Sequence, residues 1–243
     1  MTITSFILIA LAGYLIGSIS FARVITKLVK PEVNLDHTRT HQSTTGEVGT
    51  ISGIGASTAS IALGTKYGGL VVLFDMLKAM LPILALQIIF PGQSYGLVFS
   101  IFAILGHNYP IYYGFSGGRG LSPMLGSLLV IEPIGMVAAL FVSTILSMLI
   151  NQPPTSLFLW FPLLALWSWF IQTNIPVAIY TMLLMVLFIV AEIPEIKLAL
   201  QYRKQGRMVE YNEMILESAP QMRMMKRLTE RFRFWDNKKT NEE

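Results

Sequence analysis

A glycine-rich segment between two apolar runs holds the residue types best suited to binding an anion. It reads Gly114-Phe-Ser-Gly-Gly-Arg-Gly120 and follows Gly106-His-Asn-Tyr-Pro110. Glycines let backbone N–H groups approach a ligand closely, and a series of such groups forms an anion nest. The Arg119 guanidinium adds a forked donor for phosphate, and a helix beginning near Leu121 adds its positive dipole end. The segment predicts a phosphate or carboxylate site; the alternative is a plain interhelical loop with one positive-inside arginine.

Three further side chains that could do chemistry lie inside apolar runs. His107 stands beside the glycine segment, either as a functional group or as a hydrogen-bonded structural histidine. Asp75 and Lys78 are three residues apart and therefore share one helix face. Burying a charged side chain in a membrane costs free energy, so such residues usually indicate a functional site. The structural alternative is an ion pair that holds two helices together.

The composition indicates an integral membrane protein. Of the 243 residues, 53% are hydrophobic and 13% are charged, whereas soluble domains carry about 25% charged residues. The chain has no cysteine, which excludes disulfides and cysteine metal sites, and its three histidines argue against a histidine-built metal centre. We expect no cofactor, and the net charge of +4 gives no specific indication of nucleic acid.

The elements that must position these residues are apolar runs long enough to cross a bilayer as helices. Glu132 before Pro133 marks a break within one of them. The runs are Ile3–Val29, Gly68–Phe90, Ser94–Tyr113, Leu121–Ile150, Thr155–Ile171 and Asn174–Ala191, and Thr50–Gly64 is a seventh candidate.

The distribution of basic residues predicts an odd number of crossings. Lys27, Lys30 and Arg39 follow the first run, and the tail from Lys197 holds 11 Lys or Arg residues. Positive residues mark the cytoplasmic side, which places the amino terminus outside the plasma membrane and the carboxyl terminus inside. We therefore predict an all-α, multi-pass bundle of about seven helices of unequal length.

The chain divides into a membrane domain, residues 1–196, and a basic cytoplasmic tail, residues 197–243. In the tail, apolar residues from Met222 to Trp235 recur at helical spacing between arginines and lysines, and Pro220 suits the first turn of a helix. This pattern predicts an amphipathic helix on an anionic membrane surface, with a solvated charged tail as the alternative.

Several of these segments, in order, resemble the PlsY-type acyltransferases, a family that makes lysophosphatidic acid from acyl phosphate and glycerol 3-phosphate. The family pattern GHxFPxFxxFxGGKGVAT is similar to GHNYPIYYGFSGGRGLSP, from Gly106 to Pro123. The family's YLxGSIPxG is matched from Tyr14 to Ser20, and its DxxKG by Asp75, Lys78 and Ala79. The resemblance extends over about Tyr14 to Ile196.

The chain departs from the family at several motif positions. Against GSGNxGATNxxR it reads TISGIGASTASI over residues 50–61, so the family's two asparagines become Gly53 and Thr58 and its arginine becomes Ile61. Against RHxxNIxR the histidine and asparagine positions hold Glu192 and Glu195. In the glycine segment the family's two lysine positions hold Ser116 and Arg119. Glu192 puts negative charge where an anionic substrate is expected, and this charge must be paired or protonated to be tolerated.

The resemblance implies a membrane acyltransferase in phospholipid synthesis that acts by direct attack, without a covalent enzyme intermediate. Lys78 and His107 would support the polar end of the substrates as catalytic residues. Phosphate would be held by Ser52, Gly117, Gly118, Arg119 and Gly120. The first alternative is a divergent relative that keeps the anion loop but has lost or altered the reaction. The second is a small transporter, for which an internal repeat is the expected signature.

Overall fold

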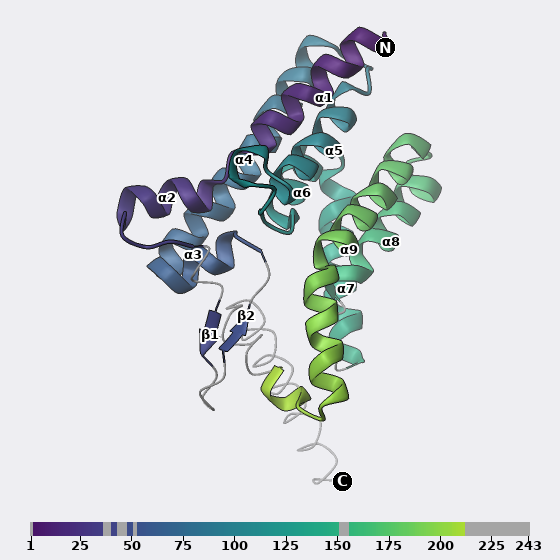
Figure 1. The fold of residues 1–243 in the computed structure, drawn as a ribbon. Coiled ribbons are helices and arrows are strands. Elements are labelled where there is room, and N and C mark those ends of the chain that lie inside the picture. Colours follow the sequence, from purple (N-terminus) through teal and green to yellow (C-terminus); the bar gives the residue numbers. More distant parts are fainter. Residues whose placement is uncertain (1, 36–39, 43–47, 51–52, 151–155, 212–243) are drawn as a thin grey trace, which may run out of the picture.

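Helices dominate the computed structural model, which describes residues 2–35, 40–42, 48–50, 53–150 and 156–211 (Figure 1). The α-helices are α1 (Ile3–Gly17), α2 (Phe21–Val29), α3 (Ala56–Leu63), α4 (Thr65–Ile89), α5 (Tyr95–Asn108), α6 (Leu121–Ile131), α7 (Pro133–Leu149), α8 (Ser156–Leu166) and α9 (Ile175–Lys204). A short antiparallel ribbon, β1 (Thr40–Gln42) and β2 (Val48–Thr50), lies between α2 and α3 in sequence. The predicted all-α bundle is confirmed, with this ribbon of two three-residue strands as an addition.

Apolar helices of membrane length confirm the membrane prediction. Ile3–Val29, α4 and α9 are each long and apolar enough to cross a bilayer. The shorter apolar helices cover Leu121–Ile131, Pro133–Leu149 and Ser156–Ile171. The start of α1 and the end of α9 lie at opposite ends of the bundle (Figure 1).

The first apolar run is two helices rather than the one that its composition suggests. Helix α1 ends at Gly17, Ser20 takes an extended conformation, and α2 starts at Phe21 in a new direction (Figure 1). The Tyr14 carbonyl, near the end of α1, accepts from both the Ser18 N–H at 2.9 Å and the Ser18 hydroxyl at 2.8 Å. This unwound turn also leaves the Ile19 carbonyl available to a side chain from α4.

The segment Thr50–Gly64 does not supply a seventh crossing. Its helix, α3, has eight residues, and at about 1.5 Å per residue it spans far less than the roughly 30 Å of a hydrocarbon core.

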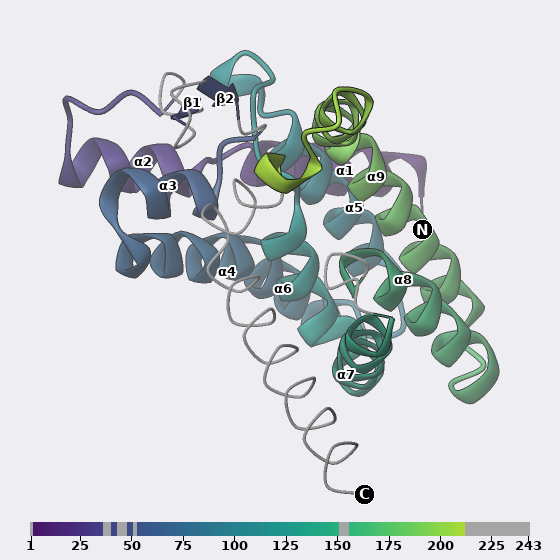
Figure 2. The same ribbon diagram turned by 90° about the horizontal axis from the view of Figure 1, so that it is seen from below.

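The predicted break in Leu121–Ile150 is confirmed, because α6 ends before Glu132 and Pro133 begins α7. Helix α7 is seen nearly end-on where α6 lies across the view (Figure 2), so the chain turns sharply at this break. The total of seven crossings stays a prediction.

Helix α9 begins at a capped residue and runs further than the polar tail suggests. The Asn174 side chain accepts from the Val177 N–H and caps its start. The helix continues past Ala191 to Lys204, so the predicted boundary at residues 196 and 197 falls inside it. The division into two domains stays a prediction, and the expected surface helix from Pro220 lies outside the described residues.

Close contact between α1 and α5 depends on glycines at their crossing. A Cβ on Gly17 would collide with the Ala103 carbonyl, and one on Gly106 with the Tyr14 carbonyl. These positions let the two backbones approach, as small residues do between membrane helices. The contact matters for function because it fixes the carboxyl end of α5, which leads into the glycine-rich segment.

We expect Gly17→Ala to destabilise the bundle by about 1–3 kcal/mol, since the added methyl overpacks a backbone contact. Gly69→Ala is the matched control, because Gly69 is an exposed position of α4 where a Cβ would meet no atom of the described residues within 4 Å. Unfolding of the two purified variants in detergent checks this. Equal stabilities would contradict the close α1–α5 contact.

Candidate active site

The glycine-rich segment, residues 114–120, folds back onto the end of α5. The Gly118 N–H donates to the His107 carbonyl at 3.0 Å. A Cβ on Gly117 would collide with the same carbonyl, and one on Gly118 with the His107 ring nitrogen Nε2. Gly120, with φ of +81°, is the residue before α6. Glycine is therefore required here for space at two positions and for backbone conformation at a third.

A second backbone segment lies against this loop and comes from the stretch before α3. The Ile54 N–H donates to the Gly117 carbonyl at 2.8 Å. Gly53 has φ of +95°, in the region that favours glycine, and its carbonyl accepts from the Thr58 hydroxyl at 2.8 Å. The Thr58 hydroxyl thus fastens the first turn of α3 to the Gly53 segment, and the Ile54 N–H joins that segment to the loop. Ser52, a predicted phosphate ligand, lies just outside the described residues.

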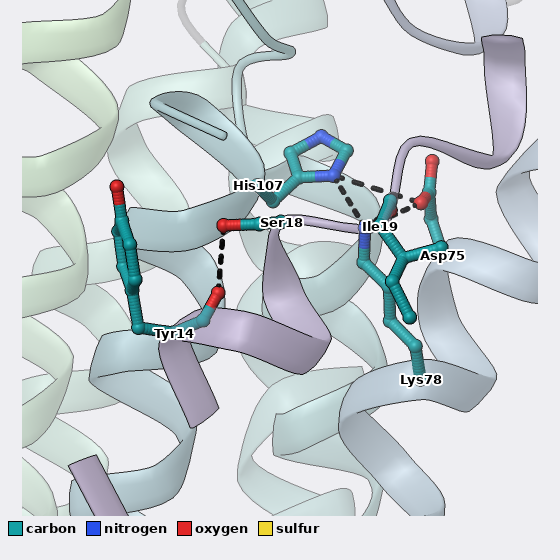
Figure 3. A network of polar contacts seen from close by, with 6 residues as sticks. All are labelled: Tyr14, Ser18, Ile19, Asp75, Lys78 and His107. Atoms are coloured by element: carbon teal, nitrogen blue, oxygen red, sulfur yellow. Dashed lines mark hydrogen bonds and ion pairs between the residues drawn. The ribbon is translucent and has the colours of Figure 1, made fainter. Parts of the chain in front are cut away.

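Asp75, Lys78 and His107 form a buried polar cluster between α4 and α5 (Figure 3). The Lys78 Nζ lies 2.7 Å from the Asp75 carboxylate and 2.9 Å from the His107 Nδ1. It also donates to the Ile19 carbonyl at 2.8 Å. The predicted Asp75–Lys78 pair is therefore present, and it reaches His107 and the unwound turn after α1. Because His107 also contacts Gly118, this cluster adjoins the glycine loop directly.

Arg119 points away from that cluster, toward α9. Its guanidinium lies 3.3 Å from the Glu192 carboxylate and donates to Glu195 at 2.8 Å. The Tyr211 hydroxyl donates to the other Glu195 oxygen at 3.4 Å. Burial raises the pKa of Tyr211, and the neighbouring Glu195 carboxylate raises it further, so the phenol keeps its proton. The negative charge at Glu192 is thus paired with the Arg119 guanidinium.

A cavity of about 200 Å³ lies where the loop, the Gly53 segment and α9 meet. Its lining residues are Gly53, Asn108, Tyr109, Ser116, Gly117, Gly118, Val190, Ala191 and Pro194. Asn108 is buried, and neither atom of its amide has a hydrogen-bond partner among the described residues. A buried amide in this state costs free energy unless a ligand or water satisfies it. The cavity therefore suits a polar ligand.

The structure brings most of the predicted site residues together and adds some that the sequence did not indicate. Gly117 and Gly118 line the cavity, while His107 and Lys78 lie behind Gly118. Arg119 belongs to the same loop but is engaged by α9, and Gly120 positions α6 rather than the cavity. Ile61, at the family's arginine position, is 40% exposed.

Sequence reasoning did not identify Asn108, Tyr211 or the Ile19 carbonyl as parts of the site. Glu192 and Glu195 are three residues apart and share one face of α9, and this spacing could have predicted that one cation pairs with both.

The fold and the site define an integral membrane helix bundle with a glycine loop beside a polar cavity. The family profile described as glycerol-3-phosphate acyltransferase matches residues 7–201. The chain belongs to this family, which confirms the PlsY-type resemblance.

Sequence and structure comparisons agree on this assignment. The glycerol-3-phosphate acyltransferase of Aquifex aeolicus is 36% identical over 122 residues, which is 50% of this chain and 57% of that protein. One from Oceanobacillus iheyensis is 33% identical over 135 residues, 52% of this chain and 59% of its own length. The matches thus cover little more than half of these curated relatives.

Crystal structures of PlsY, an integral membrane glycerol 3-phosphate acyltransferase, have the same fold. The glycerol 3-phosphate form has a TM-score of 0.65 at 25% identity, covering 84% of this chain and 94% of that one. The lysophosphatidic acid form has a TM-score of 0.64 at 24% identity, covering 85% and 97%.

Proposed function

We propose that this protein transfers a fatty acyl group from acyl phosphate to glycerol 3-phosphate, giving lysophosphatidic acid for phospholipid synthesis. The observation that carries the proposal is the cavity between the glycine loop and α9, whose wall holds the Asn108 amide, without a hydrogen-bond partner in the described part of the chain. Family membership supports the same reaction.

The chemistry needs binding and orientation rather than a nucleophile from the protein. The acceptor hydroxyl oxygen attacks the acyl carbonyl carbon, the bond from that carbon to the phosphate oxygen breaks, and inorganic phosphate leaves with the hydroxyl proton. Backbone N–H groups of a glycine loop and nearby donors stabilise such charge when they are fixed in advance. The apolar surfaces between the helices suit the acyl chain.

The Arg119 ion pairs favour a second candidate function, in which the loop is kept but the acceptor or the reaction is changed. Arg119 is the one cation in the glycine-rich segment, and two carboxylates already hold it. A substrate phosphate must compete with Glu192 and Glu195 for this guanidinium. Genetic complementation of a strain that lacks its glycerol-3-phosphate acyltransferase separates the two candidates. Growth would eliminate the second candidate, and failure of an expressed, membrane-inserted protein to support growth would eliminate the first.

We expect the Glu192→Gln, Glu195→Gln double variant to bind glycerol 3-phosphate about tenfold more tightly than the parent protein. One charge-assisted hydrogen bond from Arg119 to the substrate phosphate contributes about 1.4 kcal/mol, and this free energy corresponds to a tenfold change in Kd. Calorimetric titration of the purified proteins measures this difference. Glu210→Gln is the control, because Glu210 pairs with Arg207 and does not line the cavity. Unchanged or weaker binding by the double variant would show that the carboxylates do not compete with substrate.

In this proposal the amino terminus lies outside the plasma membrane and the carboxyl terminus in the cytoplasm. The basic tail supports this orientation, as do the opposite positions of the start of α1 and the end of α9 (Figure 1). The chain has no cysteine, so single cysteines report position without interference. In intact cells we expect an impermeant maleimide to label Thr2→Cys, and to label Gln205→Cys only after permeabilisation. The reverse pattern, or equal labelling, would overturn the orientation.

A further inference from the structure

The hydrogen bonds around Lys78 determine how its neighbour His107 carries its proton. A lysine ammonium has three N–H donors and no acceptor. Three acceptor atoms lie within 2.9 Å of the Lys78 Nζ: an Asp75 carboxylate oxygen, the Ile19 carbonyl oxygen and the His107 Nδ1. The Ile19 carbonyl is available because the chain unwinds between α1 and α2. The ammonium therefore hydrogen-bonds with the Ile19 carbonyl and the His107 Nδ1 and forms an ion pair with Asp75, whose nearest oxygen has no hydrogen-bond partner among the described residues.

This arrangement requires the His107 Nδ1 to be an unprotonated acceptor. A proton on Nδ1 would face the ammonium at 2.9 Å, and two donors repel. Asp75 does not offer Nδ1 a good alternative, because its oxygen is 3.6 Å from that nitrogen, beyond hydrogen-bond range. A neutral imidazole carries one proton, so this proton lies on Nε2.

The protonated nitrogen faces the glycine loop. The His107 Nδ1 turns toward Lys78 and Asp75, while the other ring nitrogen points away from both (Figure 3). That nitrogen, Nε2, abuts the backbone of Gly118, where a Cβ would collide with it. Gly118 in turn lines the cavity beside the unsatisfied Asn108 amide. The ring thus presents an N–H on the loop side.

We infer that Lys78 is a positioning residue that fixes His107 as the Nε2–H form, and that His107 donates to an anionic phosphate oxygen at the glycine loop. In this form His107 has no free lone pair toward the substrates, because Nδ1 is occupied by Lys78 and Nε2 carries the proton. It is therefore a hydrogen-bond donor and does not act as a general base. The identity of the anion as a substrate phosphate rests on the proposed function, whereas the tautomer does not.

Nitrogen NMR on a protein with a single histidine tests the tautomer directly. The chain has three histidines, so His37→Gln and His41→Gln leave His107 as the sole imidazole. With ¹⁵N-labelled histidine, we expect a protonated Nε2 and an unprotonated Nδ1 near neutral pH. Lys78→Met in the same background is expected to change this to a mixture of forms. If it alone fails to fold, the Asp75→Leu, Lys78→Met variant, which leaves no unpaired charge, gives the same readout. A protonated Nδ1 in the parent would overturn the inference, as would an unchanged tautomer in the lysine variants.

Adding inorganic phosphate, and separately glycerol 3-phosphate, tests the donor role. We expect the Nε2 resonance to shift with either ligand and to saturate. A resonance that does not move would overturn the donor role of His107. A shift in a protein that makes no lysophosphatidic acid would instead leave the inference standing and count against the proposed function.

Activity separates a donor from a base. The amide nitrogen of glutamine can replace the Nε2–H donor, but it cannot take up a proton. We therefore expect His107→Gln to keep kcat/KM within about tenfold of the parent, and His107→Ala to lose about a hundredfold. A general base would lose about 10²–10⁴-fold in both variants. Equal, large losses in folded His107→Gln and His107→Ala proteins would contradict the donor role.

Discussion

Asp75→Leu alone is expected to lower the free energy of unfolding of the bundle by about 3–5 kcal/mol. Asp75 and Lys78 are both buried, and their charged atoms lie 2.7 Å apart. Removing the carboxylate leaves the ammonium in an apolar helix interface with only neutral partners, the Ile19 carbonyl and His107. Breaking a buried pair costs far more than the pair itself contributes, because the remaining charge loses its compensation.

The matched variant is Asp75→Leu, Lys78→Met, which removes both charges and keeps similar volumes. We expect it to recover most of the lost stability, since replacing a buried pair by apolar residues is often neutral or stabilising. Denaturant titration of the purified proteins in mild detergent measures both variants. If the double variant is as unstable as Asp75→Leu, the ion pair is not what compensates these charges.

Arg119→Ala is expected to lower kcat/KM for acyl transfer by about 10²–10³-fold, the usual cost of removing a charge-stabilising donor. Arg119 is the cation of the glycine-rich segment and follows Gly118, which lines the cavity. Arg119→Lys keeps the charge but not the forked geometry, so an intermediate loss is expected. Steady-state assays with varied glycerol 3-phosphate measure these losses, and the exposed Lys66→Ala is the control.

Stability must be separated from activity in this experiment. Arg119→Ala also leaves Glu192 and Glu195 without the guanidinium that pairs with both. Adding Glu192→Gln and Glu195→Gln to Arg119→Ala removes those unpaired charges, so the triple variant should fold normally and remain inactive. Recovery of activity in the triple variant would mean that Arg119 acts on folding and not on substrate.

The apolar runs and the short motifs were accessible to sequence reasoning for a physical reason. A membrane helix needs a long uncharged run, and a glycine loop needs glycine at positions without room for a side chain. Both requirements are local, so α4, α9 and the segment around Gly118 could be predicted. The Asp75–Lys78 pair was also local, since residues three apart share a helix face.

The long-range pairings were not accessible in this way. Arg119 meets Glu195 across 76 positions of sequence, and this pairing depends on how α9 is rotated against the loop. The break after Gly17 lies inside one run, Ile3–Val29, that is long and apolar enough as a whole to cross a bilayer, so composition did not separate α1 from α2. Without that break the Ile19 carbonyl would not accept a hydrogen bond from Lys78, and the ammonium would not be held in the same way beside His107. These features follow from packing and not from periodicity.

The most direct test is an acyl transfer assay on the purified protein with acyl phosphate and labelled glycerol 3-phosphate. We expect labelled lysophosphatidic acid that requires both substrates, and a signal at least about a hundredfold lower from Arg119→Ala. Folding of both proteins is checked by their unfolding in the same detergent. Product from the folded parent protein no greater than that from Arg119→Ala would contradict the proposed acyltransferase function.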